Sequence, residues 1–291
     1  MKLLVLGASG MLGHKAWEVF GREFETYGTL RSAPFSSWFT ESERVIAGVR
    51  AEDPQSLSNA LSRFRPDVVV NCIGVVKQLA AARSAIPSIT INALFPHQVA
   101  ELAASADARM IQISTDCVFS GRKGFYNEDD LPDPIDLYGR TKLLGETAYD
   151  HTLTIRTSII GRELVGAHGL LEWFLSQTGT VRGYTDAVFS GVTTETLADM
   201  LVRVIADHPT LAGVWHVAGE RITKYDLLQQ VARAYKHDVT IEADDSVRID
   251  RSLDDTRFRA ATRIARPNWS EMLAQLTRDP TPYREMRAVT C

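Results

Sequence analysis

Short apolar runs alternate with longer amphipathic segments through the first half of the chain. Leu3–Leu6 and Asp67–Cys72 are almost continuously apolar, which is typical of strands buried on both faces of a parallel sheet. Further strands are predicted at 26–30, 44–49, 109–114 and 153–156, and helices at 11–20, 54–64 and 87–104. This alternation predicts an α/β protein with a doubly wound parallel sheet (Rossmann type) and right-handed crossovers.

A glycine-rich turn follows the first predicted strand and opens the first predicted helix. Its spacing is Gly7-x-x-Gly10-x-x-Gly13. Strand, glycine turn and helix N-terminus in this order form a cradle for dinucleotide phosphates, although such a turn can also be purely structural. Gly7 permits the tight turn, Gly10 lets the backbone approach the pyrophosphate, and Gly13 lets the helix pack against the sheet. The predicted cofactor-binding residues of this turn are Gly7, Ser9, Gly10, Met11, Leu12 and Gly13.

The second predicted strand ends at Arg31, where an acidic residue would bind the adenosine ribose and favour NAD. A guanidinium suits a 2′-phosphate, so we predict NADPH as the preferred cofactor, with NADH as the alternative. A solvated surface arginine is the competing interpretation. The next aromatic segment, Pro34–Phe39, is predicted to be a packed loop rather than a lid.

Two further strand ends are expected at the same sheet edge, because ligands bind outside the carboxyl ends of parallel strands. Cys72, Ile73 and Gly74 follow the fourth strand and are expected to face the nicotinamide half of the cofactor. Lys77 extends this rim and suits an anionic substrate, although an exposed lysine is the commoner case. Thr115 follows the fifth strand, where its hydroxyl can hydrogen-bond a substrate oxygen, although Ser-Thr-Asp is also typical of a turn.

Tyr138 and Lys142 stand four residues apart in a predicted helix, so their side chains share one face. An ammonium beside a phenol favours the ionised phenol and lowers a pKa that is ordinarily about 10. The pair is therefore predicted to exchange a proton near neutral pH. The spacing alone is weak, and it gains weight from the cofactor cradle and from Thr115.

Composition excludes several classes of function. The chain has 291 residues and a net charge of −4, so neither a nucleic-acid nor a membrane-surface partner is expected. Its three cysteines are far apart, and neither they nor the seven histidines form a metal-binding motif, so no metal site is predicted. No signal peptide or membrane-spanning apolar segment is evident, which favours a cytoplasmic protein.

These motifs resemble those of the extended short-chain dehydrogenases/reductases, and more narrowly the dTDP-4-dehydrorhamnose reductase branch, which reduces 4-keto sugar nucleotides. The resemblance covers nearly the whole chain. It rests on the glycine turn, Asn71–Gly74, Ser114–Gly121, Tyr138-x-x-x-Lys142, Arg156–Ser158 and Arg251–Leu253. Cys117 and Ile159 depart from residues common in the family, which leaves the identity of the sugar open.

The resemblance implies roles for particular residues. Thr115, Tyr138 and Lys142 fall on the family's catalytic triad, and Thr115 with Asp116 falls on its sugar-contacting pair. Arg251 and Arg182 are expected to clamp the substrate pyrophosphate, with surface ion pairs as the alternative.

The resemblance also implies two domains. The cofactor domain would comprise residues 1–157 and 183–221, and a smaller α/β nucleotide-sugar domain would comprise 158–182 and 222–291. The expected activity is NAD(P)H-dependent reduction of a dTDP- or UDP-linked 4-keto-6-deoxy sugar for surface polysaccharide or deoxysugar synthesis. The alternatives are an NAD-dependent 4-epimerase and a non-catalytic dinucleotide-binding regulatory subunit. The family's habit of pairing through helices is compatible with a homodimer.

Overall fold

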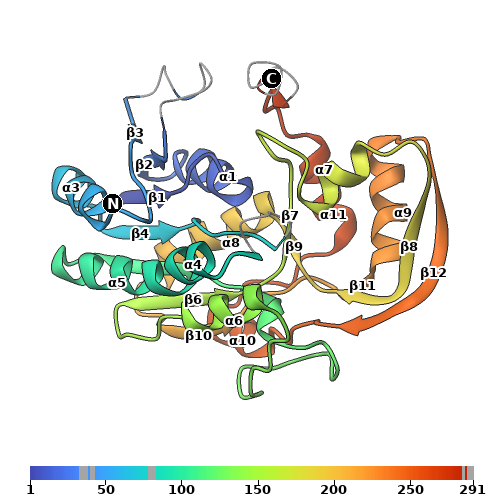
Figure 1. Ribbon diagram of the computed structural model, residues 1–291. Helices are drawn as coiled ribbons and strands as arrows, with labels where there is room; N and C mark the ends of the chain where they lie inside the picture. Colours follow the sequence, from blue (N-terminus) through green and yellow to red (C-terminus); the bar gives the residue numbers. More distant parts are fainter. Residues whose placement is uncertain (33–38, 40–42, 78–82, 284–285, 287–291) are drawn as a thin grey trace.

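The computed structural model describes residues 1–32, 39, 43–77, 83–283 and 286, and it is built around one parallel sheet (Figure 1). This sheet has seven strands in the order β10-β6-β5-β4-β1-β2-β3, and every neighbouring pair is parallel. The strands are β1 (Lys2–Leu6), β2 (Glu25–Leu30), β3 (Val45–Ala47), β4 (Val68–Asn71), β5 (Arg109–Ile113), β6 (Thr152–Arg156) and β10 (Gly213–His216). The predicted doubly wound sheet is confirmed, although β3 is shorter than the strand expected over 44–49. Except for Phe39, the aromatic segment lies outside the described residues.

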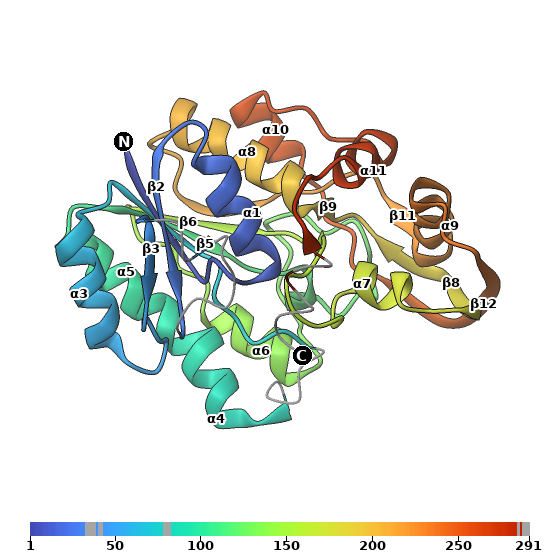
Figure 2. The ribbon, with the colours of Figure 1, turned by 90° about the horizontal axis from the view of Figure 1, so that it is seen from above.

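Helices cover both faces of this sheet (Figure 2). Helices α1 (Met11–Phe20) and α8 (Thr194–Asp207) pack together on one face, and α3 (Pro54–Phe64) and α5 (Phe95–Ser105) cover the other. The helix predicted over 87–104 begins as α4 (Ala85–Ser88) and continues through the π-helical segment η2 (Ile89–Leu94) into α5. Pro96 has no N–H to donate to the carbonyl of Asn92, which accounts for the irregular turns at this point.

A second, smaller lobe contains a three-stranded sheet in the order β11-β8-β12. Its elements are β8 (Gly179–Phe189), β11 (Ile222–Thr223), β12 (Val239–Asp250), α7 (Leu170–Leu175), α9 (Lys224–Tyr235) and α11 (Trp269–Thr277). The short strands β7 (Ile159–Ile160) and β9 (Val192–Thr193) pair where the chain passes between the lobes, and α10 (Thr256–Thr262) contacts β10.

The expected boundary at residues 182/183 differs from the observed course of the chain. Strand β8 continues across it and pairs with β12 from Gly179–Val239 to Val188–Asp250. A strand hydrogen-bonded over this length cannot divide between two sheets, so residues 183–189 belong with the small sheet. The chain then passes through β9, which pairs with β7, to α8 and to β10 of the large sheet.

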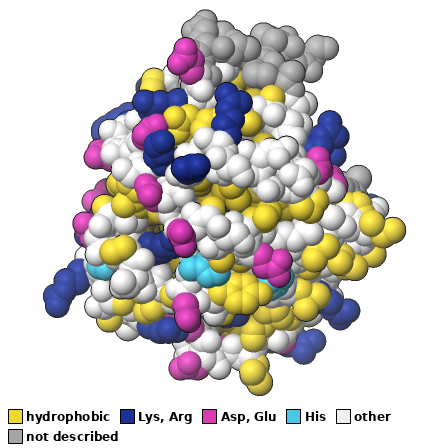
Figure 3. Space-filling view, turned by 90° about the vertical axis from the view of Figure 1, so that its left-hand side faces the viewer, with side chains coloured by type: hydrophobic (Ala, Val, Ile, Leu, Met, Phe, Trp, Pro, Cys, Tyr) yellow, Lys and Arg dark blue, Asp and Glu magenta, His cyan; other side chains and the backbone are white. Residues whose placement is uncertain are grey.

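Charges of both signs are mixed on the face shown in Figure 3, where Lys and Arg side chains lie among Asp and Glu side chains and hydrophobic groups. This distribution agrees with the small net charge of −4. Among the described residues, no helix combines the length and the apolar character needed to cross a membrane.

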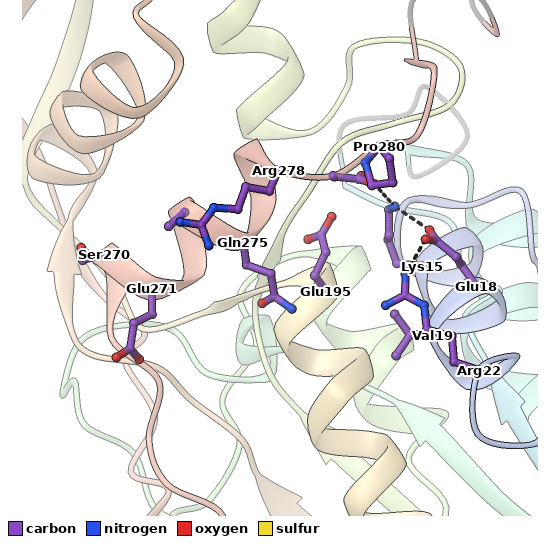
Figure 4. Close-up of a pocket in the computed structure, with 12 residues that line it drawn as sticks. Lys15, Glu18, Val19, Arg22, Glu195, Ser270, Glu271, Gln275, Arg278 and Pro280 are labelled. Atoms are coloured by element: carbon purple, nitrogen blue, oxygen red, sulfur yellow. Dashed lines mark hydrogen bonds and ion pairs between the residues drawn. The ribbon is translucent and has the colours of Figure 1, made fainter.

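A polar cavity of about 550 Å³ lies between α1, α8 and α11 (Figure 4). Glu195 of α8 is a buried acidic group in its lining and is 5% exposed. One carboxyl oxygen accepts a hydrogen bond from the Thr194 hydroxyl at 3.0 Å, and the other is buried without a hydrogen-bond partner. Burial raises the pKa of Glu195 to about 7, because a carboxylate loses its hydration there, while Lys15 opposes the rise.

Glu195→Gln is expected to stabilise the protein above pH 8 and to have little effect near pH 4. Below pH 4 the carboxyl is protonated in both the folded and the unfolded state. As the pH rises toward about 7, only the unfolded state readily releases this proton, so Glu195 lowers the unfolding free energy by up to about 3 kcal/mol. Urea unfolding of both proteins at the two pH values tests this, and an equal difference at both would contradict it.

Candidate active site

A cleft of about 440 Å³ opens at the carboxyl ends of β1, β4 and β5, between the large sheet and the small lobe. It brings together most of the residues that the sequence predicted for the site, from four separate parts of the chain. Those lining it are Ser9, Gly10, Met11, Leu12, Cys72, Ile73, Gly74, Lys77, Thr115, Asp116, Tyr138 and Lys142.

The glycine turn has the geometry of a phosphate cradle. Gly7 has a φ of +79°, in the region that favours glycine, and its carbonyl accepts a hydrogen bond from the Gly10 N–H at 3.0 Å. Helix α1 starts at Met11, and no side chain of its N-cap residue, Gly10, competes for the first N–H groups. These groups can therefore meet an anion at the positive end of the helix dipole. The turn thus fits a dinucleotide pyrophosphate.

Gly13 supports this turn from behind rather than lining the cleft. A Cβ atom at this position would lie 2.0 Å from the Gly7 carbonyl oxygen. The helix approaches the turn so closely because Gly13 has no side chain.

Gly13→Ala is expected to displace the turn, lowering the unfolding free energy by about 1–3 kcal/mol and weakening NADP(H) binding at least tenfold, because overpacking forces backbone shifts. Fluorescence titration and urea unfolding measure the two effects. Gly21→Ala at the far end of the same helix, where the nearest atom would be 3.1 Å away, is the matched control with a smaller expected loss. Equal losses in both variants would contradict the role of Gly13.

The position of Tyr138 is set by the start of helix α6 (Leu137–Leu144). The side chain of Asp136 caps this helix by accepting a hydrogen bond from the Gly139 N–H at 2.8 Å. A Cβ atom on Gly139 would lie 2.2 Å from the Cys117 carbonyl oxygen, so the helix packs directly against the segment after β5. This contact brings the phenol of Tyr138 within hydrogen-bond reach of the Thr115 hydroxyl.

Lys142 lies one helical turn further along, and its ammonium donates a hydrogen bond to the Ile113 carbonyl at 2.7 Å. The expectation that Lys142 lowers the pKa of Tyr138 is wrong for this structure. Burial raises the pKa of Tyr138 above its ordinary value, and a hydrogen bond with Thr115 offsets this only in part. Burial also lowers the pKa of Lys142 to about 8. Burial is the largest influence on the pKa of both groups, so Tyr138 holds its proton at neutral pH and is suited to act as an acid.

The small lobe contributes residues to the cleft that the sequence analysis missed. Lys224, at the start of α9, lies with its ammonium 3.7 Å from the centre of the Phe189 ring. Burial raises the pKa of Asp116, while the charges of Arg251 and Lys224 oppose that rise. A lysine that opens an amphipathic helix gave no signal of its own, because only the packing of the two lobes turns it toward Asp116.

Three predicted arginines do not line the described part of the cleft. Arg31 is exposed and pairs with Glu52 at 3.2 Å, and Arg182 is exposed beside Asp244 at 3.6 Å. Arg251 donates a hydrogen bond to the Phe119 carbonyl at 2.8 Å and another to the Cys117 sulfur at 3.8 Å. Lys77, on the rim, pairs with Asp136 at 2.7 Å. The roles of these side chains toward cofactor and substrate stay predictions.

The sheet, the glycine turn and the Thr115–Tyr138–Lys142 cluster together define a Rossmann-type protein of the extended short-chain dehydrogenase/reductase class. More particularly, the chain belongs to the RmlD substrate binding domain family, whose sequence profile matches residues 1–282. This match confirms the resemblance inferred from the motifs.

Two curated relatives illustrate the range of the family. Spore coat polysaccharide biosynthesis protein SpsK of Bacillus subtilis is 29% identical over 235 residues, which is 77% of this chain and 75% of that protein. Methionine adenosyltransferase 2 subunit beta of Mus musculus is 29% identical over 148 residues. That match spans 50% of this chain and only 42% of the length of the subunit.

Solved structures agree with the fold. A hypothetical dTDP-4-dehydrorhamnose reductase from Sulfolobus tokodaii is 27% identical, with a TM-score of 0.76 over 89% of this chain and 94% of that one. The dTDP-4-dehydrorhamnose reductase of Bacillus anthracis in complex with NADP is 20% identical, with a TM-score of 0.79 over 94% and 98% of the two chains. Together with the family match, the first of these similarities agrees with the predicted class of NAD(P)H-dependent sugar-nucleotide reductase, and the second supports the fold.

Proposed function

We propose that this protein uses NAD(P)H to reduce the 4-keto group of a nucleotide-linked 4-keto-6-deoxy sugar. The observation on which this rests is that Thr115, Tyr138 and Lys142 meet the glycine turn in one cleft. The names of SpsK and of the reductases described above agree with a role in polysaccharide or deoxysugar synthesis.

The bound cofactor would supply hydride to the carbonyl carbon of the sugar. Tyr138 donates its proton to the alkoxide that forms, and its raised pKa keeps this proton in place until charge develops. Thr115 hydrogen-bonds the same oxygen, which stabilises charge that is present only in the transition state. Lys142 is proposed to leave the Ile113 carbonyl for the ribose of the nicotinamide half.

The preference for NADPH is proposed from Arg31, whose guanidinium would exchange its exposed partner Glu52 for the 2′-phosphate. For the dTDP or UDP moiety, we propose Lys77, Arg182 and Arg251 as anion-binding side chains and Asp116 as a contact to the sugar. Each arginine would have to leave or share its present partner.

A homodimer through the helices beside the cleft is also proposed. Exposed apolar side chains gather on neighbouring elements there, namely Ile86 of α4, Ile89 and Leu94 of η2, and Leu144 of α6. Light scattering after gel filtration should give twice the monomer mass, and Leu144→Glu should shift the protein toward the monomer.

An absorbance assay of NADPH oxidation against dTDP- and UDP-linked 4-keto-6-deoxy sugars tests the function, with NMR reading the product. Stoichiometric oxidation with one of these sugars is expected. Interconversion of 4-epimers without net NADPH oxidation would instead identify an epimerase. Tight dinucleotide binding without turnover of any of the sugars would favour a regulatory subunit.

A further inference from the structure

The segment that follows α11 crosses helix α1 directly behind the glycine turn. Asp279 accepts a hydrogen bond from the ammonium of Lys15 at 2.6 Å, and the two side chains are only 4% and 2% exposed. The same ammonium donates to the Thr281 hydroxyl at 2.7 Å and to Glu18 at 2.7 Å. Figure 4 shows Lys15 reaching from α1 toward this segment at Pro280. This buried ion pair, with its further hydrogen bonds, fixes the segment after α11 to helix α1.

A chain of hydrogen bonds continues from this segment to the glycine turn. The fully buried ring of His14 lies between Tyr283 and Gly10, with its Nδ1 2.8 Å from the Gly10 carbonyl and its Nε2 2.9 Å from the Tyr283 hydroxyl. Because a carbonyl can only accept, Nδ1 must be the protonated nitrogen of this contact. The Tyr283 hydroxyl also lies within hydrogen-bond distance of the Asp279 carboxylate, and its single hydrogen is donated either to Nε2 of His14 or to this carboxylate. The Tyr283 hydroxyl therefore links the terminal segment to the backbone of the turn through one imidazole.

The same tyrosine packs against residues of both lobes next to the cofactor cleft. Its ring forms a buried apolar cluster with Ala8 of the glycine turn, Leu30 at the end of β2, and Leu164 of the small lobe. The guanidinium of Arg162, also from the small lobe, lies 4.6 Å from the centre of the ring. Residues far apart in the sequence thus meet at Tyr283.

We propose that the segment Asp279–Tyr283 holds the phosphate-binding turn in its binding conformation, with Tyr283 as a positioning residue that acts through His14 on Gly10. A turn already held in shape loses less conformational entropy when the dinucleotide binds, so affinity is higher than for a free turn. The inference rests on the proposed dinucleotide site, but not on the identity of the sugar.

Tyr283→Phe tests this role, because it keeps the ring and its packing and removes only the hydroxyl. The expected result is an increase of about tenfold in the Kd for NADPH, measured by fluorescence titration without substrate, with kcat at saturating NADPH within about twofold of the parent protein. The size follows from the loss of one hydrogen bond in a buried network. His14→Phe should weaken binding similarly, and the double variant should be no weaker than either single variant, because both break the same chain of hydrogen bonds.

Tyr149→Phe is the matched control. Tyr149 makes a comparable hydrogen bond to a histidine, with its hydroxyl 3.0 Å from Nδ1 of His97, but it lies outside the cleft. Its Kd for NADPH should not change. If Tyr283→Phe does not fold, Asp279→Asn, which keeps the shape of the side chain, should give the same increase in Kd. A Kd unchanged from the parent protein, with only a lower melting temperature, would overturn the proposal, whereas NADPH binding without sugar reduction would overturn only the proposed function.

Discussion

Tyr138→Phe is expected to lower kcat by about 10²- to 10⁴-fold while NADP(H) binding survives, because it removes the only proton donor assigned to the forming alkoxide. The phenylalanine ring keeps the packing of α6 against the segment after β5, which depends on Gly139 and Cys117 rather than on the hydroxyl. Steady-state oxidation of NADPH gives kcat, and a fluorescence titration gives the Kd of the cofactor.

The electrostatics of the site make this prediction specific. Burial keeps the phenol protonated at neutral pH, so the proton that Tyr138 donates is present in nearly every molecule of the parent protein. Thr115 remains in the variant and can still stabilise the oxygen, but its hydroxyl is a far weaker acid than a phenol. Tyr184→Phe, at an exposed position of strand β8, is the control and should retain full activity. Near-normal turnover of Tyr138→Phe would refute the assignment of Tyr138 as the acid.

The sequence was sufficient for those parts of the site that follow from local pattern. A buried strand followed by Gly7, Gly10 and Gly13 predicts a phosphate turn, because backbone geometry alone creates it. The carboxyl ends of parallel strands meet at one edge, so Cys72–Gly74 and Thr115 were predictable neighbours of the turn. These residues do lie together in the cleft.

Other features depend on contacts between distant parts of the chain. The pKa of Tyr138 is set mainly by burial, which the spacing to Lys142 does not reveal. The course of β8 depends on β12, whose paired residues lie about 60 positions later, such as Val239 opposite Gly179. His14 is unremarkable in the sequence, and only the return of the C-terminal segment makes it a link between Tyr283 and Gly10.

Glu146→Ala is expected to lower the unfolding free energy by about 3–5 kcal/mol, because it leaves a buried guanidinium without its counter-charge. The carboxylate of Glu146 makes a bidentate contact with Arg156, at 2.8 Å to Nε and 2.7 Å to Nη2, and the side chains are only 6% and 7% exposed. It also accepts a hydrogen bond from the Ser114 hydroxyl at 2.7 Å, which would lose its partner. Urea unfolding at pH 7 measures the loss.

The same substitution should also disturb the positions of Thr115 and Tyr138. Ser114 directly precedes Thr115, and Glu146 follows the helix of Tyr138, α6, by two residues. Arg156→Met leaves the opposite charge unpaired and should cost a similar free energy. The double variant should cost less than the sum of the two, since neither unpaired charge then remains. Two results would show that the Glu146–Arg156 pair does not hold the end of β5 against α6. One is a double variant whose loss of unfolding free energy equals the sum of the two single losses, and the other is a loss below about 1 kcal/mol in Glu146→Ala. In that case the alignment of Thr115 with Tyr138 would have to come from the contact between Gly139 and Cys117 alone.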